Sequence, residues 1–296
     1  MASKTKADPT GQRNNRAKAI KQVNKRLAVA FSKVLTLFNA IPRTRRTEAK
    51  VGNASSVVYD YDISPQQIET LEAEVTTLIA ISLGTTDERV PANWWYKPNI
   101  ELPFRQGVTQ ELIEFNQLIA GAAVAGVTVR GMPPRPLPVE LVLSSPKYFE
   151  LLNYEYVRNY GIFSNLSSQT SYQVMERIEA GMQAGATPSM IADDIAERFK
   201  VAGSNASRIV RTEVNWSYNN ARMSAIELAA GETGLRSAVM HISSLTPTTR
   251  TWHAARHGKV YNVADQRAWW SRGANQINCL CSVHAVLVDD EGNVVS

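Results

Sequence analysis

Residues 139–234 constrain the fold most, because helical patterning runs through almost all of this segment. Four helices are expected in it, over residues 147–159, 168–182, 188–199 and 205–230. Thr187-Pro188 is typical of a helix start and Gly231 of a helix end. Since single helices are marginally stable in water, these helices must cover their apolar faces with one another or with a sheet. The segment is therefore predicted to be a helical bundle.

Residues 235–296 have a different pattern, which predicts a small sheet. Short β-rich stretches occur at 238–242, 259–262 and 279–288, with loops between them. Helices followed by such strands indicate a predominantly helical α+β fold. In this fold the long helix 205–230 would pack on a small antiparallel sheet and form a C-terminal module.

The first 60 residues predict a basic tail and an extended helical arm. After a polar tail over residues 1–14, Ile20, Leu27 and Val34 recur every seventh residue, with further apolar residues between them. This heptad-like seam predicts a helix that ends before Pro42 and needs a packing partner. The mixed charged and small residues of 43–60 predict a linker.

Residues 61–138 predict a helical middle region. Ser64-Pro65 begins a helix expected over 65–83, with Gln67 in the capping-box position, and a second helix is expected over 110–125. The stretch 91–104 has three prolines and predicts irregular structure anchored by Trp94 and Trp95. Four prolines within 131–138 predict a stiff linker.

Charge is concentrated at the N-terminus. The net charge is +5, yet residues 1–50 hold 13 Lys or Arg and 2 acidic residues, so the remainder is net acidic. A basic arm suits nucleic-acid phosphates or an acidic protein surface. The candidate contact residues are Arg13, Arg16, Lys18, Lys21, Lys25, Arg26, Lys33, Arg43, Arg45 and Arg46. A solvated basic helix without a partner is the alternative.

The remaining composition is that of a soluble globular protein, with 44% hydrophobic and 20% charged residues. No apolar run approaches the ~18 residues of a membrane span. The N-terminus lacks the apolar region of a secretory signal, so synthesis in the cytoplasm is expected.

The helix 205–230 carries a polar stripe opposite its apolar face. At 100° per residue, Arg208, Thr212, Asn215, Asn219 and Arg222 fall together, and Arg211 borders them. A solvated stripe would more often hold Lys and Glu, which are better helix formers than Thr and Asn. The stripe therefore predicts partners in the C-terminal module or in another subunit, with an anion-binding or catalytic role as the alternative.

The two cysteines and all four histidines lie after residue 240, which is the clustering that a zinc site needs. A site of Cys279, Cys281 and His253, completed by His257 or His284, is chemically reasonable. On an extended strand, however, both cysteines would face one side and His284 the other. Four roles of the cysteines stay open: core packing, a zinc site, a catalytic thiol and a redox role. A disulfide between the two cysteines is disfavoured, because their Cα–Cβ bonds would be nearly parallel.

The loop 250–259 is cationic and contains Arg250, His253, Arg256, His257 and Lys259. Such groups can cleave phosphodiesters, so a metal-independent or zinc-dependent nuclease or toxin-like enzyme is an alternative. No acid and base can be paired, and we therefore expect no catalytic residues and no enzyme activity.

Three motifs resemble the phage Mu F-like minor head proteins. The first is the helical segment 187–231 with Arg211-Thr212-Glu213, Asn219 and the closing glycine; the second is Arg250, His253 and Gly258 within 249–261; the third is Asn278-Cys279-Leu-Cys281. The resemblance assigns these motif residues structural roles. Many relatives carry an acid shortly before the Arg-Thr pair, where this sequence has Thr246-Pro-Thr-Thr249, so a role for that carboxylate is not expected here.

The resemblance implies a minor capsid protein of the bacteriophage virion. Such a protein associates with the portal vertex inside the head and assists head morphogenesis, DNA packaging or DNA ejection. The implied partners are the portal protein, the major capsid protein and packaged double-stranded DNA, with several copies around the portal and no membrane. A DNA-binding protein that acts through the basic arm is the further alternative. No cofactor is expected apart from a structural zinc ion, which the cysteines and histidines would suit.

Overall fold

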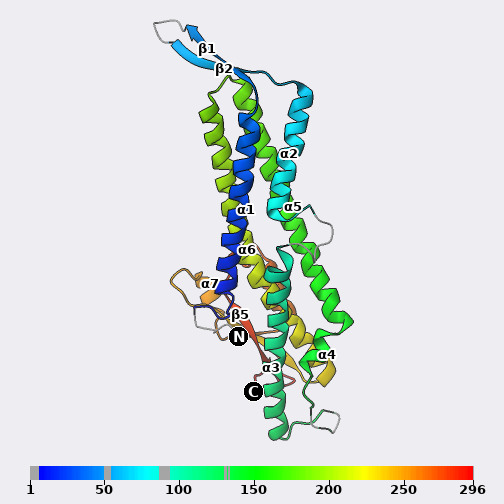
Figure 1. Cartoon of the computed structure of the whole chain (residues 1–296). Coiled ribbons are helices and arrows are strands. Elements are labelled where there is room, and N and C mark those ends of the chain that lie inside the picture. The colour runs from blue at the N-terminus through cyan, green and yellow to red at the C-terminus, as the bar shows by residue number, and fades with distance from the viewer. Residues whose placement is uncertain (1–6, 50–54, 87–93, 130–131, 133, 296) are drawn as a thin grey trace. The chain divides into compact units, whose positions relative to one another are not determined.

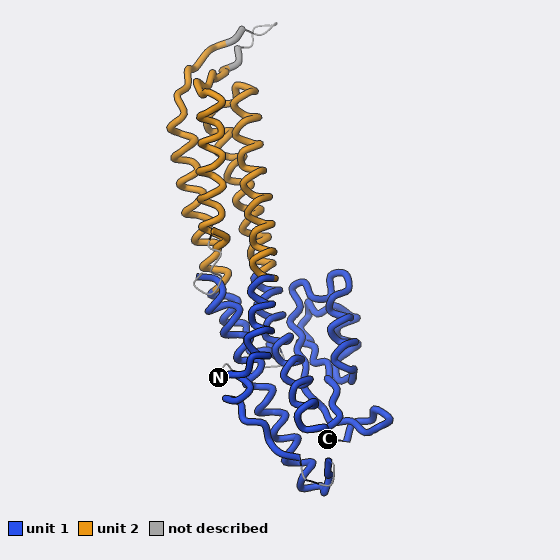
Figure 2. The backbone as a smooth tube through the Cα atoms, turned by 90° about the vertical axis from the view of Figure 1, so that its right-hand side faces the viewer, with its two compact units in different colours: residues 1–18, 94–157, 210–296 blue, residues 19–93, 158–209 orange. Residues whose placement is uncertain are grey.

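The computed structural model describes residues 7–49, 55–86, 94–129, 132 and 134–295 (Figure 1). It is predominantly helical with two small antiparallel sheets, which confirms the predicted α+β class. The chain forms two compact units (Figure 2). Unit 1 comprises residues 1–18, 94–157 and 210–296, and unit 2 comprises 19–93 and 158–209. Both units combine segments that are far apart in the sequence. The sequence patterns predicted consecutive segments instead, at 1–60, 61–138, 139–234 and 235–296.

Four helices supply the core of unit 2. They are α1 (Arg13–Asn39), α2 (Pro65–Leu83), and the parts of α5 (Pro146–Gln183) and α6 (Pro188–Thr233) that belong to this unit. On α1 the predicted seam is buried at Val23, Leu27, Ala30 and Val34. Helix α2 has the predicted bounds, because Ser64 and Gln67 form the capping box and Gly84 ends the helix in the left-handed conformation.

The predicted linker at 43–60 is wrong, because this segment contains a β-hairpin. Strand β1 (Arg43–Ala49) pairs antiparallel with β2 (Ser55–Tyr61). The hairpin is held by the turn between α5 and α6: Tyr59 N–H donates to Gly185 O at 3.0 Å, and Tyr61 Oη donates to Ala186 O at 2.8 Å. These contacts are distant in sequence, so a local pattern of charged and small residues does not indicate them.

Two pairs of predicted helices are each one continuous helix. The expected helices 147–159 and 168–182 are both part of α5, and 188–199 and 205–230 are both part of α6. The polar residues between them do not break the helices; in α5, Ser171 Oγ donates to Ser167 O at 2.8 Å and so satisfies its own hydroxyl inside the helix. The helix predicted over 110–125 also begins earlier than expected.

The stretch predicted as irregular is largely helical. Residues 91–93 lie outside the described part of the chain, a π-helical turn (η2) spans Lys97–Glu101, and α3 spans Leu102–Val124. Prolines fit there because the first turn of a helix leaves its N–H groups unbonded. Trp95 is buried and Trp94 is half-buried, as anchors of this segment would be.

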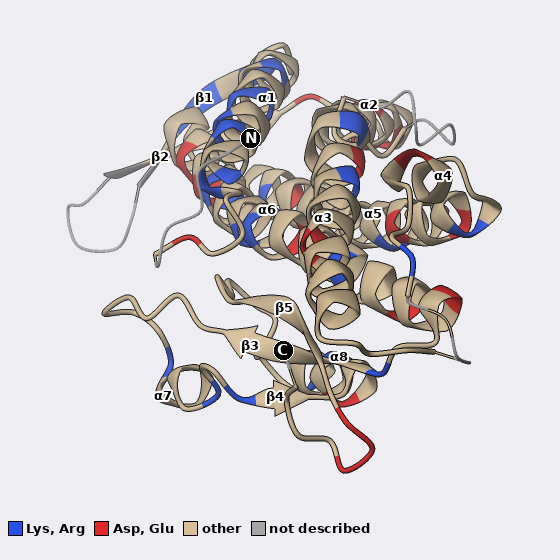
Figure 3. Ribbon diagram, turned by 90° about the horizontal axis from the view of Figure 1, so that it is seen from below, with Lys and Arg blue, Asp and Glu red and all other residues tan. Residues whose placement is uncertain are grey.

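Unit 1 contains a three-stranded antiparallel sheet in the order β4-β3-β5 (Figure 3). Its strands are β3 (Ser237–Ile242), β4 (Val260–Tyr261) and β5 (Ser282–Leu287), and the short helices α7 (Thr251–Ala254) and α8 (Val263–Ser271) lie with them. Helix α3 approaches α6 closely at Gly107, where an added Cβ would lie 2.4 Å from Tyr218 O. The predicted module of a long helix with a small sheet is confirmed.

The proline-rich segment 131–138 lies within unit 1. Residues 131 and 133 fall outside the described part of the chain, and short helix α4 (Val139–Leu143) follows. Asn116 fixes the end of the segment, because its side chain accepts from Leu137 N and donates to Leu137 O. Across the described residues, no helix has both the length and the apolar character that a membrane crossing requires.

Candidate metal centre

Helix α6 holds the loop that carries both cysteines. Asn215 Nδ2 donates to Cys279 O at 2.9 Å and to Cys281 O at 3.2 Å, and Asn219 Nδ2 donates to Cys281 O at 2.9 Å. Thr212 Oγ1 accepts from the backbone N–H of Asn278 at 3.1 Å. The polar stripe of α6 therefore has partners within the same unit of the chain.

The loop itself has a constrained backbone. Asn278 has φ 53°, a left-handed conformation that asparagine adopts more readily than most residues. This turn brings Cys279 and Cys281 to the side of α6. The predicted strand over 279–288 is wrong at its start, because β5 begins at Ser282 and both cysteines precede it. The cysteine side chains are therefore not governed by the alternation of a strand.

The other face of Asn215 binds the N-terminal segment. Its Oδ1 accepts from Thr10 Oγ1 and from Arg16 Nη1, both at 2.9 Å, and Arg16 also pairs with Asp8 at 3.3 Å. Arg16 is buried, and desolvation lowers the pKa of its guanidinium. The prediction that Arg16 contacts nucleic acid or a partner is therefore wrong. The mobile tail expected over residues 1–14 is also wrong for its described part, since Asp8 and Thr10 are buried and α1 begins at Arg13.

The other basic candidates differ in exposure. Arg26 and Arg43 are half-buried, and the guanidinium of Arg43 lies over the Phe38 ring. Arg46 is exposed but pairs with Asp60. The remaining candidates are all exposed: Arg13, Lys18, Lys21, Lys25, Lys33 and Arg45.

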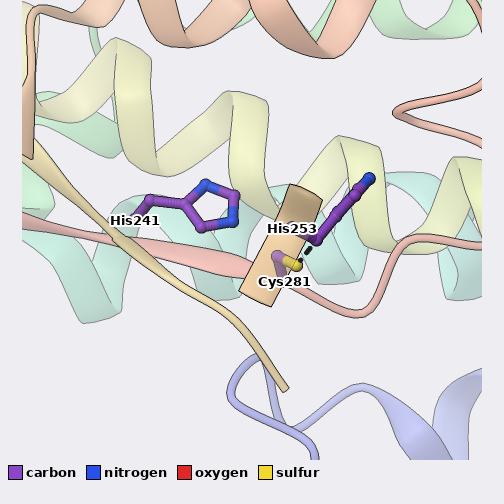
Figure 4. Close-up of side chains that lie close together, drawn as sticks. All are labelled: His241, His253 and Cys281. Carbon is purple, nitrogen blue, oxygen red and sulfur yellow. Dashed lines mark hydrogen bonds between the residues drawn. The ribbon is translucent and has the colours of Figure 1, made fainter. Parts of the chain in front are cut away.

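Two histidines meet the cysteines in the core of the module. His241 comes from β3 and His253 from α7, and ligand atoms of His241, His253 and Cys281 lie within 4.8 Å of one another (Figure 4). His253 Nδ1 is 3.4 Å from Cys281 Sγ and 3.6 Å from Cys279 Sγ. All four side chains are buried. The structure thus brings together three of the residues predicted as metal ligands and adds His241.

The predicted fourth ligands lie elsewhere. His284 Nδ1 is 2.8 Å from a carboxylate oxygen of Glu114 and 3.1 Å from Arg222 Nη2, so the prediction of His284 as a cysteine partner is wrong. The register pairs His241 with Val283 and His284 with Met240, which turns the two histidines to opposite faces of the sheet. His257 is exposed and its Nδ1 accepts from Ser243 N–H at 3.1 Å.

A charge cluster surrounds His284. Arg222 of α6 contacts Glu111 and Glu114 of α3, and both Arg222 and Glu111 are fully buried. Burial raises the pKa of the Glu111 carboxyl, and the nearby Arg222 guanidinium counteracts that rise. Neither the cluster nor its separation from the cysteines is visible in the sequence, because it depends on how α3 packs on α6.

Further residues that sequence reasoning missed orient the histidines. Arg256 Nη2 donates to Gln266 Oε1 at 3.0 Å, and Gln266 Nε2 is 3.2 Å from His241 Nδ1. His241 Nδ1 therefore accepts, and the Nε2 edge of its ring turns toward Cys281 (Figure 4). Trp269 packs edge-on against both His241 and His253, at centroid distances of 5.3 and 4.7 Å.

The thiols differ electrostatically. Hydrogen bonding from Cys279 lowers the pKa of the Cys281 thiol, and contacts with His241 and His253 act in the same direction. The same interaction with Cys281, together with burial, raises the pKa of Cys279. A catalytic thiol would need a group that orients its histidine. Within the described chain His253 Nε2 has no hydrogen-bond partner, so His253 is not oriented in this way, whereas His241 is held by Gln266.

A cavity of about 180 Å³ opens beside the centre, lined by His253, both cysteines and the polar residues Ser244, Thr246 and Thr249. The residues of the cationic loop are engaged around it. Arg250 Nη2 donates to Ile277 O at 2.8 Å, and the Arg256 guanidinium lies 3.5 Å from the centroid of the Tyr261 ring. Gly258, with φ 74°, donates its N–H to His241 O at 2.9 Å and closes the loop on β3.

The remaining family-motif residues lie on both sides of α6. Glu213 and Asn219 are buried, and Arg211 is exposed. The motifs at Arg211–Glu213, Arg250–Gly258 and Asn278–Cys281, which are separate in the sequence, therefore meet in the C-terminal module.

Comparison with protein families gives a match to the model described as Phage Mu protein F like protein, over residues 172–284. This segment is a little over a third of the chain, and it contains most of the C-terminal module and all four residues of the candidate metal centre. Neither the curated proteins nor the solved structures give a match to the chain. Residues 172–284 are therefore similar to the phage Mu protein F-like family, in agreement with the resemblance of the three sequence motifs.

Proposed function

We propose that this protein is a minor capsid protein that associates with the portal vertex and assists assembly of the head and passage of DNA. The family match carries the proposal. In this role the protein lies inside the head near the portal, in several copies, and contacts the portal protein, the major capsid protein and packaged double-stranded DNA.

The basic residues of α1 support a contact with DNA or with an acidic inner surface. Helix α1 contains no Asp or Glu. In unit 2 it exposes Lys21, Lys25 and Lys33 on its solvent side. Positive charge on a helix that itself carries no acidic residue favours binding to a phosphate backbone, and such binding weakens steeply as salt rises.

The alternatives receive less support from the geometry. The loop 250–259 uses Arg250 and Arg256 for internal contacts, so a nuclease or toxin-like activity stays a prediction with no observation in its favour. A stand-alone DNA-binding protein would use the same α1 lysines but would not enter the virion.

Quantitative mass spectrometry of intact virions tests the proposal, together with a pull-down on the portal protein. We expect the protein in virions at a fixed ratio to portal and in the portal pull-down. Absence from both would refute the proposal. Presence in virions without binding to the portal protein would support a role as a head component and refute association with the portal vertex.

The DNA contact has its own test. Replacing Lys21, Lys25 and Lys33 together by Gln should reduce the salt dependence of binding to a DNA fragment, with a slope lower by up to about 2.7 at roughly 0.9 per lost phosphate contact. A matched control replaces three exposed lysines elsewhere, Lys147, Lys200 and Lys259, by Gln. Equal slopes for the two triple variants would reject α1 as the contact.

A further inference from the structure

We propose that His241, His253, Cys279 and Cys281 bind one Zn²⁺ ion as a closed, structural site. The site fastens β3, α7 and the cysteine loop to one another. It goes beyond the proposed role in the phage head and does not depend on it, since metal content can be measured on the isolated protein.

The distances around His253 are those of a tetrahedral zinc site. With Zn–S near ~2.3 Å and Zn–N near ~2.0 Å, tetrahedral angles place a sulfur and a nitrogen ligand about 3.5 Å apart. His253 Nδ1 lies 3.4 Å from Cys281 Sγ and 3.6 Å from Cys279 Sγ. His241 completes the set within the 4.8 Å that encloses its ligand atom with those of His253 and Cys281. Cys279 lies outside this group of three and joins the set through its contact with His253 Nδ1.

Burial distinguishes these residues from scattered polar groups. His241 is fully buried, and the exposed fractions of the other three do not exceed 6%. His241 Nε2 faces the sulfur of Cys281 and has no hydrogen-bond partner within the described chain. A buried imidazole nitrogen without a partner carries a desolvation cost, and coordination of a metal removes it.

The supporting residues fix the ligands from behind. Asn215 and Asn219 hold the carbonyl groups of Cys279 and Cys281, and the backbone N–H of Cys281 donates to Cys279 Sγ at 3.4 Å. Such N–H contacts stabilise a thiolate, and metal sites require oriented ligands of this kind. Two thiolates with two imidazoles in tetrahedral geometry select Zn²⁺ among the common divalent ions. Because all four positions come from protein, the site is structural.

The contacts of Gln266 lead to a prediction that distinguishes a zinc site from simple core packing of the same residues. A His241 that coordinates through Nε2 must carry its proton on Nδ1, so Gln266 has to present its oxygen to that nitrogen. In the structure the amide nitrogen of Gln266 faces His241, because its oxygen accepts from Arg256. Binding of zinc therefore turns the amide over, and a carboxylate at this position would serve both His241 and Arg256 without any turn.

The test begins with the full-length protein purified from zinc-supplemented cells. We expect about one zinc per chain, with X-ray absorption showing two sulfur and two nitrogen neighbours near 2.3 and 2.0 Å. Cobalt substituted for zinc should give the absorption of a tetrahedral thiolate complex. A protein that holds well under ~0.1 zinc per chain and takes up no cobalt, or whose zinc has only nitrogen and oxygen neighbours, would overturn the proposal.

Variants assign the ligands. Cys281→Ser and His241→Gln should lose zinc, whereas His257→Asn and His284→Asn should retain it, because those two histidines lie outside the set. Gln266 is a positioning residue: Gln266→Leu should weaken zinc binding by about 10-fold to 100-fold, and Gln266→Glu should restore or strengthen it. If the ligand variants fail to fold, the zinc affinities of Gln266→Leu and Gln266→Glu still test the proposal. Equal zinc affinity in Gln266→Leu, Gln266→Glu and the unmodified chain would count against coordination by His241.

Discussion

Replacement of Asn215 by Ala should destabilise the C-terminal module severely. The side chain is buried and makes four hydrogen bonds: it accepts from Thr10 and Arg16 and donates to the carbonyls of Cys279 and Cys281. After its removal, Cys281 O keeps its bond from Asn219, and Thr10 keeps its contact with Asp8. The carbonyl of Cys279 and the guanidinium of Arg16 lose their contacts with the side chain.

The magnitude follows from these losses. A neutral hydrogen bond contributes about 1 kcal/mol, a bond to a charged group about 2 kcal/mol, and an unsatisfied buried carbonyl costs about 1 kcal/mol or more. The better helix propensity of Ala returns about 0.5 kcal/mol. We therefore expect Asn215→Ala to lower the free energy of unfolding by about 3 to 4 kcal/mol.

The matched control is Asn205→Ala on the same helix. Asn205 accepts one exposed bond from Arg208, so its loss should change stability by less than about 0.5 kcal/mol. Because the chain forms two units, urea unfolding followed by circular dichroism should be combined with hydrogen exchange of peptides that cover residues 276–287. Faster exchange there is expected only in Asn215→Ala. If the two variants unfold at the same urea concentration and exchange alike, the account of the stripe as an internal anchor is refuted.

Three further predictions concern other parts of the fold. Gly185→Ala should destabilise unit 2 by about 1 to 3 kcal/mol, because φ is +63° and the added Cβ would lie 2.5 Å from a β2 side chain. Gly161→Ala inside α5 should stabilise the protein, because the added Cβ meets nothing within 4 Å. Thermal unfolding of the two variants tests this difference. Arg222→Met should lower the free energy of unfolding by urea by about 3 to 5 kcal/mol, because two carboxylates of α3 lose their buried partner. Lys200→Met, at an exposed ion pair, should lower it by under about 1 kcal/mol. Similar losses in the two variants would contradict a stabilising role of the buried charge cluster. Burial and a hydrogen bond to a carboxylate raise the pKa of Tyr156, so its contribution to the free energy of unfolding is complete below the unfolded pKa near ~10 and is lost as pH rises above that value. Tyr156→Phe should therefore lose less stability at alkaline pH, as measured by unfolding at several pH values. An unchanged dependence of stability on pH would reject this contribution of Tyr156.

Local signals explain which elements could be predicted from the sequence. Helix α2 has the expected bounds because Ser64, Pro65 and Gln67 determine its start within four residues. The hairpin β1–β2 could not be found in this way, since it depends on backbone contacts between Tyr59 and Gly185. The breaks expected inside α5 and α6 were wrong for a related reason: Ser and Asn weaken a helix locally, and burial against other helices compensates for that weakness.

The candidate site shows the same limit at single-residue scale. The motif around Cys279 and Cys281 was visible, and so was His253. The choice between His241 and His284 depends on strand register, because a shift of one residue exchanges the two faces of a sheet. The register His241↔Val283 is determined by packing of the whole sheet on its helices and by the end of β5 at Leu287. A sequence with four histidines close together therefore indicates the kind of site but leaves its fourth member open.

The internal contacts of the motif residues also bear on where partners bind. Thr212, Asn215 and Asn219 are buried against the cysteine loop, and Arg222 is buried against α3, so these side chains of the matched segment are already satisfied within the chain. Residues that hold a module together are poorly placed to recognise another protein or DNA. Exposed charge occurs both in the matched segment, at Arg211, Lys259 and Arg272, and on α1, which lies outside residues 172–284. The buried motif residues therefore account for the stability of the module, and the proposed contact with DNA is best tested on α1, where replacing lysines removes charge without disturbing the buried contacts.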